Sequence, residues 1–315
     1  MMRRQGYGGL GRGGRKKNKS KKNQSKKNQR DDKEINLTPS ERKIIRELRG
    51  TQPTTNSNKN SRTSADNSQT KPRALEKRKP VPQPNGSKRG IMPEQPCAMM
   101  FCGLSKSGKS TLLKDTLTDK NLLGGGGSSG SKPYFHTIVM MSPTADADTT
   151  ITEALKLPPE NIITNFTEDD LEEIIEAQRS KIKKEGYNKV AKTNRMLIIL
   201  DDCISHQRFL RSQTIIDLTA TVRHLLISVV FLMQSYRMIA RACRINLRGI
   251  AFFQSNRNET DVLCEEECPD SLKTREFRNL IHEATKEKYS YLFINKDRPY
   301  NERYLCKYDT ILEIV

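Results

Sequence analysis

Five continuous apolar runs stand out in the second part of the chain, separated by polar or amphipathic stretches. Because apolar residues fill consecutive positions instead of every second one, the runs predict strands buried on both faces of a largely parallel sheet. The stretches between them predict helices at about 110–119, 168–184 and 206–222. This alternation predicts an α/β fold with helices flanking a mainly parallel central sheet. The runs are CAMMFCG at 97–103, HTIVMMS at 136–142, RMLIILDD at 195–202, LLISVVFLMQ at 225–234 and GIAFFQS at 249–255.

The pattern changes after the fifth run. Acidic and basic helical stretches fill 259–285, and two further apolar segments, YSYLFIN at 289–295 and ERYLCKY at 302–308, flank the turn-forming KDRPYN at 296–301. We expect these two segments to form a terminal hairpin. The sequence GGGGSSG at 124–130 offers no chemical group and predicts a surface loop.

The first 95 residues differ in composition from the rest. They hold 26 of the 56 Lys and Arg residues but 8 of the 37 Asp and Glu, and so carry +18 of the formal net charge of +19. Their polar repeats cannot bury enough apolar surface to offset the entropy of ordering, so we expect a disordered basic arm or linker at 1–95. A capping box and an apolar stripe in LTPSERKIIRELRG predict a short helix near 39–49. We expect the folded domain at 96–315.

A basic arm in front of a nearly neutral body suits an electrostatic tether for a polyanion such as nucleic acid. The alternatives are a solvated tail that only aids solubility and a nuclear-import signal such as KKNKSKK at 16–22. Seven cysteines without any Cys-x-x-Cys pair indicate neither a disulfide framework nor a zinc ribbon. The amino terminus lacks the apolar core of a signal peptide, and the longest apolar run is about half a membrane span. We therefore expect a soluble protein that is not secreted and has no membrane span.

One short motif carries the strongest chemical signal. GLSKSGKST at 103–111 fits the phosphate-binding pattern Gly103-x-x-x-x-Gly108-Lys109-Ser110, with an apolar strand before it and a helix after it. Glycines let backbone N–H groups converge on an anion, and the helix amino terminus adds positive potential. Lys109 would reach the β- and γ-phosphates of ATP, and the Ser110 hydroxyl would ligate Mg²⁺. The residues expected to line the nucleotide are Gly103, Leu104, Ser105, Lys106, Ser107, Gly108, Lys109, Ser110 and Thr111.

Two later strands end in residues that would complete such a site. RMLIILDD places Asp201 where it would hold Mg²⁺ and Asp202 where it would polarise an attacking water. The spacing favours the ATPase class in which an additional strand separates the two motifs. The strand LLISVVFLMQ ends in Gln234, which could contact both the γ-phosphate and the water. A helix-capping role for the acid pair and a loop-satisfying role for the glutamine are the alternatives.

Together these stretches resemble the FtsK/HerA superfamily of RecA-like P-loop NTPases. The series GLSKSGKST, LIILDD, TVRHLLISVVFLMQ and IARACRINLRGIAFFQSNRNETDVL is most similar to the genome-packaging ATPases of large double-stranded DNA viruses, the poxvirus type and the virophages. The resemblance covers about residues 96–310. It implies that Gln234 is the sensor, and that an arginine from one subunit completes the site of its neighbour in a ring of five or six subunits.

The matching arginines are Arg244 and Arg248, with Arg223 as a weaker candidate. The chain departs from FtsK-type translocases at Asp202, where they generally carry Glu, although the packaging branch commonly shows the double Asp. It also departs from relatives at Lys106, where they often have Gly. We expect an ATP-driven translocase of double-stranded DNA, without sequence preference, that packages a viral genome and contacts a capsid or portal protein. It would act at virus assembly sites in the host cytoplasm or nucleus. A cellular FtsK/HerA-type translocase or helicase and a nucleic-acid-binding assembly protein with a nucleotide switch are the alternatives.

Overall fold

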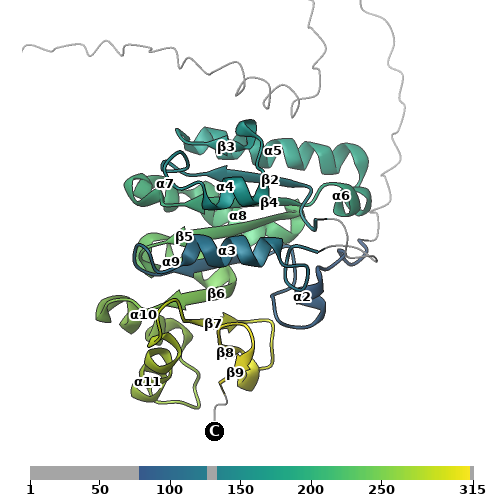
Figure 1. Ribbon diagram of the computed structural model, residues 1–315. Helices are drawn as coiled ribbons and strands as arrows, with labels where there is room; N and C mark the ends of the chain where they lie inside the picture. Colours follow the sequence, from purple (N-terminus) through teal and green to yellow (C-terminus); the bar gives the residue numbers. More distant parts are fainter. Residues whose placement is uncertain (1–77, 126–132, 313–315) are drawn as a thin grey trace, which may run out of the picture. The chain divides into compact units, whose positions relative to one another are not determined.

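The computed structural model describes residues 78–125 and 133–312 (Figure 1). The basic arm before residue 78, the expected helix at 39–49 and most of the glycine-rich segment at 124–130 lie outside the described residues.

A sheet of nine strands forms the centre of the described chain, in the order β3-β2-β4-β5-β1-β6-β7-β8-β9. The pairings from β3 to β6 are all parallel, and those from β6 to β9 are antiparallel. The fold is therefore mixed α/β with a mostly parallel sheet, as the apolar runs predict. The strands are β1 Ala98–Cys102, β2 Thr137–Met141, β3 Ile162–Ile163, β4 Met196–Asp201, β5 Ile227–Met233, β6 Leu247–Phe253, β7 Tyr291–Asn295, β8 Tyr304–Cys306 and β9 Thr310–Ile311.

Helices cover both faces of this sheet (Figure 1). The α3 and α4 side chains pack into one apolar cluster and those of α5, α8, α10 and α11 into another, on the opposite face. The helices are α2 Asn85–Lys88, α3 Lys109–Thr118, α4 Thr150–Leu155, α5 Glu168–Glu185, α6 Tyr187–Thr193, α7 Gln207–Leu210, α8 Gln213–Leu225, α9 Arg241–Asn246, α10 Arg257–Glu267 and α11 Thr274–Thr285. Short 3-10 turns occur at Pro159–Asn161, Cys203–His206, Tyr236–Met238 and Tyr300–Glu302.

Strand β1 shows why the apolar runs are continuous. Met100 and Cys102 point into the cluster under α8, whereas Met99 and Phe101 point into the cluster under α3. All five residues of the strand are buried, so both sets of alternating positions must be apolar.

The predicted helices are present with one difference. The helix expected at 206–222 is two helices, α7 and α8, with a break at Arg211 and Ser212. The Ser212 side chain caps α8 by accepting a hydrogen bond from the Ile215 backbone N–H at 3.4 Å. A serine hydroxyl that accepts a hydrogen bond from a backbone N–H takes the place of a carbonyl of the preceding turn. Ser212 therefore starts α8 and does not extend α7.

Strand β5 lies between β1 and β4 in the sheet. An additional strand therefore separates the strand of the glycine motif from the strand of the acid pair, as the spacing favours. The strand that separates them is the one that precedes Gln234, not the strand at 137–141 that lies between them in sequence. This order brings the ends of three separate motifs next to one another.

Packed structure begins on the amino-terminal side of residue 96. Met92 is 1% exposed within the cluster under α3. Gln95 accepts a hydrogen bond from the Ser228 hydroxyl at 2.8 Å, and the Glu94 N–H donates to the Asp297 carboxylate at 2.8 Å. Residues before the expected boundary thus tie the start of β5 to the turn after β7.

Candidate active site

The glycine motif forms the connection from β1 to α3, at the carboxyl edge of the parallel strands. The Gly103 N–H donates to the Met233 carbonyl at 3.1 Å, which fixes the loop to the end of β5. A Cβ built on Gly103 would lie 2.6 Å from the Phe253 Cβ, so no side chain fits at this position. The first glycine of the motif is therefore required by close approach of the backbone to β6.

Two residues of the loop adopt left-handed backbone conformations. Gly108, at the amino cap of α3, has φ of 101°, which glycine tolerates. Lys106 has φ of 62° and is exposed to solvent. Relatives often carry glycine at this position, and glycine is the residue that adopts this backbone conformation most easily. A lysine here raises the conformational free energy of the loop.

Lys109 lies across the loop that precedes it. Its ammonium donates to the Gly103 and Leu104 carbonyls at 2.8 and 2.9 Å. Burial lowers the pKa of Lys109, and the nearby Asp201 and Asp202 carboxylates oppose this shift. A half-buried ammonium held by two carbonyls is a cation ready to exchange these acceptors for phosphate oxygens.

The loop also contains a polar atom that has no protein partner. The Ser107 hydroxyl is buried, and no hydrogen-bond partner for it occurs among the described residues. A buried hydroxyl without a partner is costly, so the loop is suited to an oxygen-rich ligand. The remaining loop residues face outward: Leu104, Ser105 and Thr111 are exposed.

Ser110, in the first turn of α3, donates from its hydroxyl to the Asp148 carboxylate at 3.1 Å. Asp148 precedes α4 and belongs to no recognisable motif, so sequence reasoning missed it. Its carboxylate also acts electrostatically on Asp201. The three side chains therefore lie together and offer the hard oxygen ligands that Mg²⁺ prefers.

Asp201, the last residue of β4, is 7% exposed. Burial raises the pKa of its carboxyl to about 6, the Asp202 and Asp148 charges add to this effect, and Lys109 opposes it. A cation beside the carboxylate would reverse the shift. Within the described residues no group of three His, Cys, Asp or Glu side chains is arranged to hold a metal ion.

Asp202 and Gln234 lie side by side, although 32 positions separate them in the sequence. The Gln234 side-chain amide donates to the Asp202 carboxylate at 2.9 Å. Asp202 has a left-handed backbone, φ 47° and ψ 37°, in the turn that follows β4. The strand-end glutamine and the second acid are thus one hydrogen-bonded unit beside the phosphate loop.

Two of the three candidate arginines form ion pairs away from the phosphate loop. Arg244 is 8% exposed and forms a bidentate ion pair with Glu266, with N–O distances of 2.7 and 2.8 Å. Arg248 pairs with Asp297 at the start of β6, which is the opposite end of the sheet from the loop, and its side chain is 41% exposed. Arg223 is exposed at the end of α8.

Two arginines that sequence reasoning missed are exposed at the loop edge. Arg237 follows β5, and Arg257 begins α10 directly after β6. Among the described residues the Arg237 guanidinium donates to the Asn258 carbonyl at 3.3 Å, and the Arg257 guanidinium lies 3.8 Å from the Asp261 carboxylate. Their place at strand ends is the sequence signal that could have identified them.

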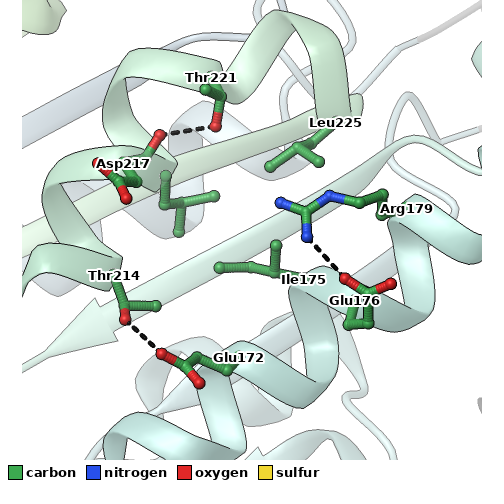
Figure 2. A pocket seen from close by; sticks show the side chains of 9 residues that line it. Glu172, Ile175, Glu176, Arg179, Thr214, Asp217, Thr221 and Leu225 are labelled. Carbon is green, nitrogen blue, oxygen red and sulfur yellow. Dashed lines mark hydrogen bonds and ion pairs between the residues drawn. The ribbon is translucent and has the colours of Figure 1, made fainter.

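A separate cavity of about 330 Å³ lies between α5 and α8 (Figure 2). Glu172, Glu176 and Asp217 line it together with Arg179, whose guanidinium pairs with Glu176 at 2.6 Å. The cavity lies on the face of the sheet opposite α3 and does not include any residue of the phosphate loop.

The site combines Lys109 in a glycine-rich phosphate loop after β1 with Asp201 and Asp202 at the end of β4, and β5 lies between these two strands. This arrangement defines a P-loop ATPase of the additional-strand class. The poxvirus A32 protein family matches residues 87–311, and the chain belongs to that family. The resemblance to the poxvirus-type packaging ATPases is confirmed. No curated protein matches the sequence significantly.

Solved structures with a partly similar fold include viral and bacterial NTPases. The genome-packaging NTPase B204 of Sulfolobus turreted icosahedral virus 2, in complex with ATP-γS, is 12% identical and matches over 64% of this chain and 92% of B204, with a TM-score of 0.41. Its complex with sulfate is 13% identical over 69% and 98%, with a TM-score of 0.44. EssC of Geobacillus thermodenitrificans is 12% identical over 69% and 38%, with a TM-score of 0.40.

Proposed function

We propose that this ATPase is a translocase that uses Mg-ATP hydrolysis to move double-stranded DNA into a preformed viral capsid. Membership of the A32 family supports the viral packaging role. The observation that carries the hydrolytic function is the Asp202–Gln234 hydrogen bond beside the phosphate loop, because a simple binding site needs neither residue. ATP is the proposed substrate.

In this proposal the loop residues bind the triphosphate and Lys109 exchanges its carbonyl partners for β- and γ-phosphate oxygens. Ser110 and Asp201 would hold Mg²⁺, and Asp148 lies next to Ser110. The ion would neutralise charge that develops on the transferred phosphoryl group. Lys109 contributes to the same neutralisation from within the chain.

Asp202 orients and polarises the attacking water, and Gln234 holds Asp202 in position. In this proposal Gln234 also contacts the γ-phosphate, so the departure of that phosphate removes one partner of the residue that begins the connection from β5 to α9. We propose that this change is the signal passed from the site to the rest of the molecule.

A ring of subunits would place an arginine of one subunit at the site of the next. Arg244 would have to give up its ion pair with Glu266 for this role, whereas Arg248 is more exposed but lies at the far edge of the sheet. Arg237 and Arg257 lie at the same edge as the loop and are added as candidates. The described helices include none long and apolar enough to span a bilayer. We place the protein at virus assembly sites, with a capsid or portal protein as partner.

The test is steady-state ATP hydrolysis with and without duplex DNA of unrelated sequences. We expect DNA of any sequence to stimulate turnover, less so at high salt because phosphate contacts release counterions.

Lys109→Ala should abolish hydrolysis. Asp202→Asn should lower kcat at least roughly 100-fold while retaining ATP binding. Hydrolysis that is indifferent to DNA at every salt concentration would refute translocation, and hydrolysis indifferent to Asp202→Asn would refute the assigned base.

Ring assembly has its own test. Each of Arg237→Ala, Arg244→Ala, Arg248→Ala and Arg257→Ala is mixed in increasing proportion with wild-type subunits. An arginine that acts on the neighbouring subunit should lower activity more steeply than dilution alone predicts. A linear decrease for all four variants would contradict a trans arginine among them.

A further inference from the structure

Tyr289 borders the phosphate loop, although it belongs to none of the motifs that define the site. It lies in the turn between α11 and β7. A Cβ built on Gly108 would lie 3.3 Å from the Tyr289 Cδ1 and 3.9 Å from its Cβ. The tyrosine is nevertheless 56% exposed, so an accessible aromatic ring stands directly against the amino cap of α3.

Folding alone does not explain a tyrosine at this position. Its φ of 66° is left-handed, a conformation that bulky residues rarely adopt. The following residues, Ser290 and Tyr291, are buried and anchor the start of β7, but the Tyr289 ring contributes little to the core. A glycine or asparagine would suit this turn better. Strain and an exposed ring occur together at the edge of a ligand site, which indicates a role in binding.

The ring is also open to flat or cationic groups. The Lys288 ammonium lies 4.8 Å from the ring centroid, within the range of a cation–π contact. The face of the ring is therefore accessible to a solvent-exposed side chain, and a planar ligand can reach it as well.

The order of the strands shows which end of a nucleotide would come near this ring. Asp202 and Gln234, which act on the γ-phosphate in the proposed function, follow β4 and β5. These strands lie on one side of β1, and β6 and β7 lie on the other. A triphosphate bound along the loop with its γ-phosphate toward β4 and β5 has its nucleoside toward β6 and β7. Tyr289 precedes β7 on that side.

We propose that Tyr289 is the stacking platform for the base of the bound nucleoside triphosphate. The inference rests on the proposed function, because it takes the loop to be a nucleotide site. Every base has a π face, so such a platform adds affinity for any nucleobase, and it adds more for the larger rings of purines. Tyr289 thus supplies the base-binding part of a site whose known motif covers only the phosphates.

The chain contains no tryptophan, which provides a direct readout. In the full-length Tyr289→Trp variant the single indole should change in fluorescence when ATP is added and remain unchanged when inorganic tripolyphosphate is added. Tyr300→Trp is the matched control, because Tyr300 is 43% exposed in the turn between β7 and β8 at the other edge of the sheet. It should respond to neither ligand. Equal responses of Tyr289→Trp to ATP and to tripolyphosphate would overturn the proposal.

Affinity gives a second readout. Tyr289→Ala should bind ATP roughly tenfold more weakly than wild type, whereas Tyr289→Phe should bind like wild type. Both variants should bind tripolyphosphate as wild type does, which also shows that they fold. An alanine variant with unchanged ATP affinity would overturn the stacking role and leave the loop assignment intact. A wild-type protein that binds neither ATP nor tripolyphosphate would instead overturn the proposed function, and the stacking role with it.

Discussion

At the scale of single residues, the buried carboxylate of Asp201 lowers the free energy of unfolding when it is ionised. Burial, together with the charges of Asp202 and Asp148, raises its pKa to about 6, compared with about 3.9 for an ordinary Asp. Between these two values the folded protein binds a proton that the unfolded chain has lost. Stability therefore falls as the pH rises through this window, and the full cost is present above about pH 6.

Asp201→Asn should stabilise the nucleotide-free protein by up to about 2–3 kcal/mol at pH 8. The advantage should shrink as the pH falls below 6, because the wild-type carboxyl then becomes neutral as well. Denaturant unfolding in EDTA at pH 5, 6, 7 and 8 measures it. Asp146→Asn, at an exposed carboxylate in the turn that follows β2, is the control and should change little. An advantage that is equal at pH 5 and pH 8 would contradict the assigned cause.

Lys106 lies in the phosphate loop, where its backbone is left-handed. Its left-handed conformation and its exposure indicate that the side chain faces solvent and is tolerated at some cost. Lys106→Gly should therefore bind ATP within about threefold of wild type, since glycine adopts this conformation freely. Lys106→Val should bind much more weakly, because a β-branched residue resists it. Equilibrium titration with ATP decides, and a large loss in the glycine variant would show that the ammonium contacts phosphate.

At the scale of elements, α10 holds the segment that follows β5. The Glu259 carboxylate, in the first turn of α10, accepts hydrogen bonds from the backbone N–H groups of Tyr236 and Arg237 at 2.6 and 3.4 Å. Farther along, Glu266 pairs with Arg244, and Glu267 accepts from the Tyr236 hydroxyl at 3.2 Å. One helix therefore fixes the connection that begins at Gln234.

Glu259→Ala should destabilise the protein by about 1–3 kcal/mol, because it leaves two backbone donors without their acceptor. It should also lower kcat more than it changes ATP affinity, since the loop after Gln234 loses its support. Thermal unfolding and steady-state kinetics measure the two effects. Glu265→Ala, at an exposed position of the same helix, is the control. If kcat is unchanged while stability falls, the carboxylate is structural only.

At the scale of the whole molecule, the folded body starts before the composition suggests. The contacts of Met92, Glu94 and Gln95 make residues up to about 95 part of the domain. Residues 1–77 hold 22 Lys and Arg against 7 Asp and Glu. A truncation at residue 77 therefore removes most of the basic charge and keeps the packed segment at 78–95, whereas a truncation at residue 95 removes both.

Deleting residues 1–77 should leave thermal stability nearly unchanged and should weaken DNA binding, with a smaller dependence of affinity on salt. Deleting residues 1–95 should in addition destabilise the fold, since it removes the buried Met92 and the Gln95 contact to β5. Thermal unfolding and DNA titrations at several salt concentrations separate the two effects. Equal stability of the two truncations would refute the structural role of residues 78–95.

Much of the fold could be predicted because its signals are local. Each buried strand is a continuous apolar run, and the glycine motif specifies its own turn between a strand and a helix. The break at Ser212 and the two-residue strand β3 were not predicted, because a single capping hydroxyl or two residues change the average pattern too little. Asp148 was missed for a related reason, since no neighbouring residue marks it.

The sequence by itself determined the class of the protein, because the phosphate loop, the acid pair and the buried strands are all set by residues close together in the chain. Only the tertiary structure decided which distant residues meet. It placed Gln234 on Asp202, Asp148 on Ser110 and Tyr289 against Gly108, and it paired Arg244 with Glu266. The physical reason is that the order of strands in a sheet depends on burial over the whole domain, and no local pattern records that order.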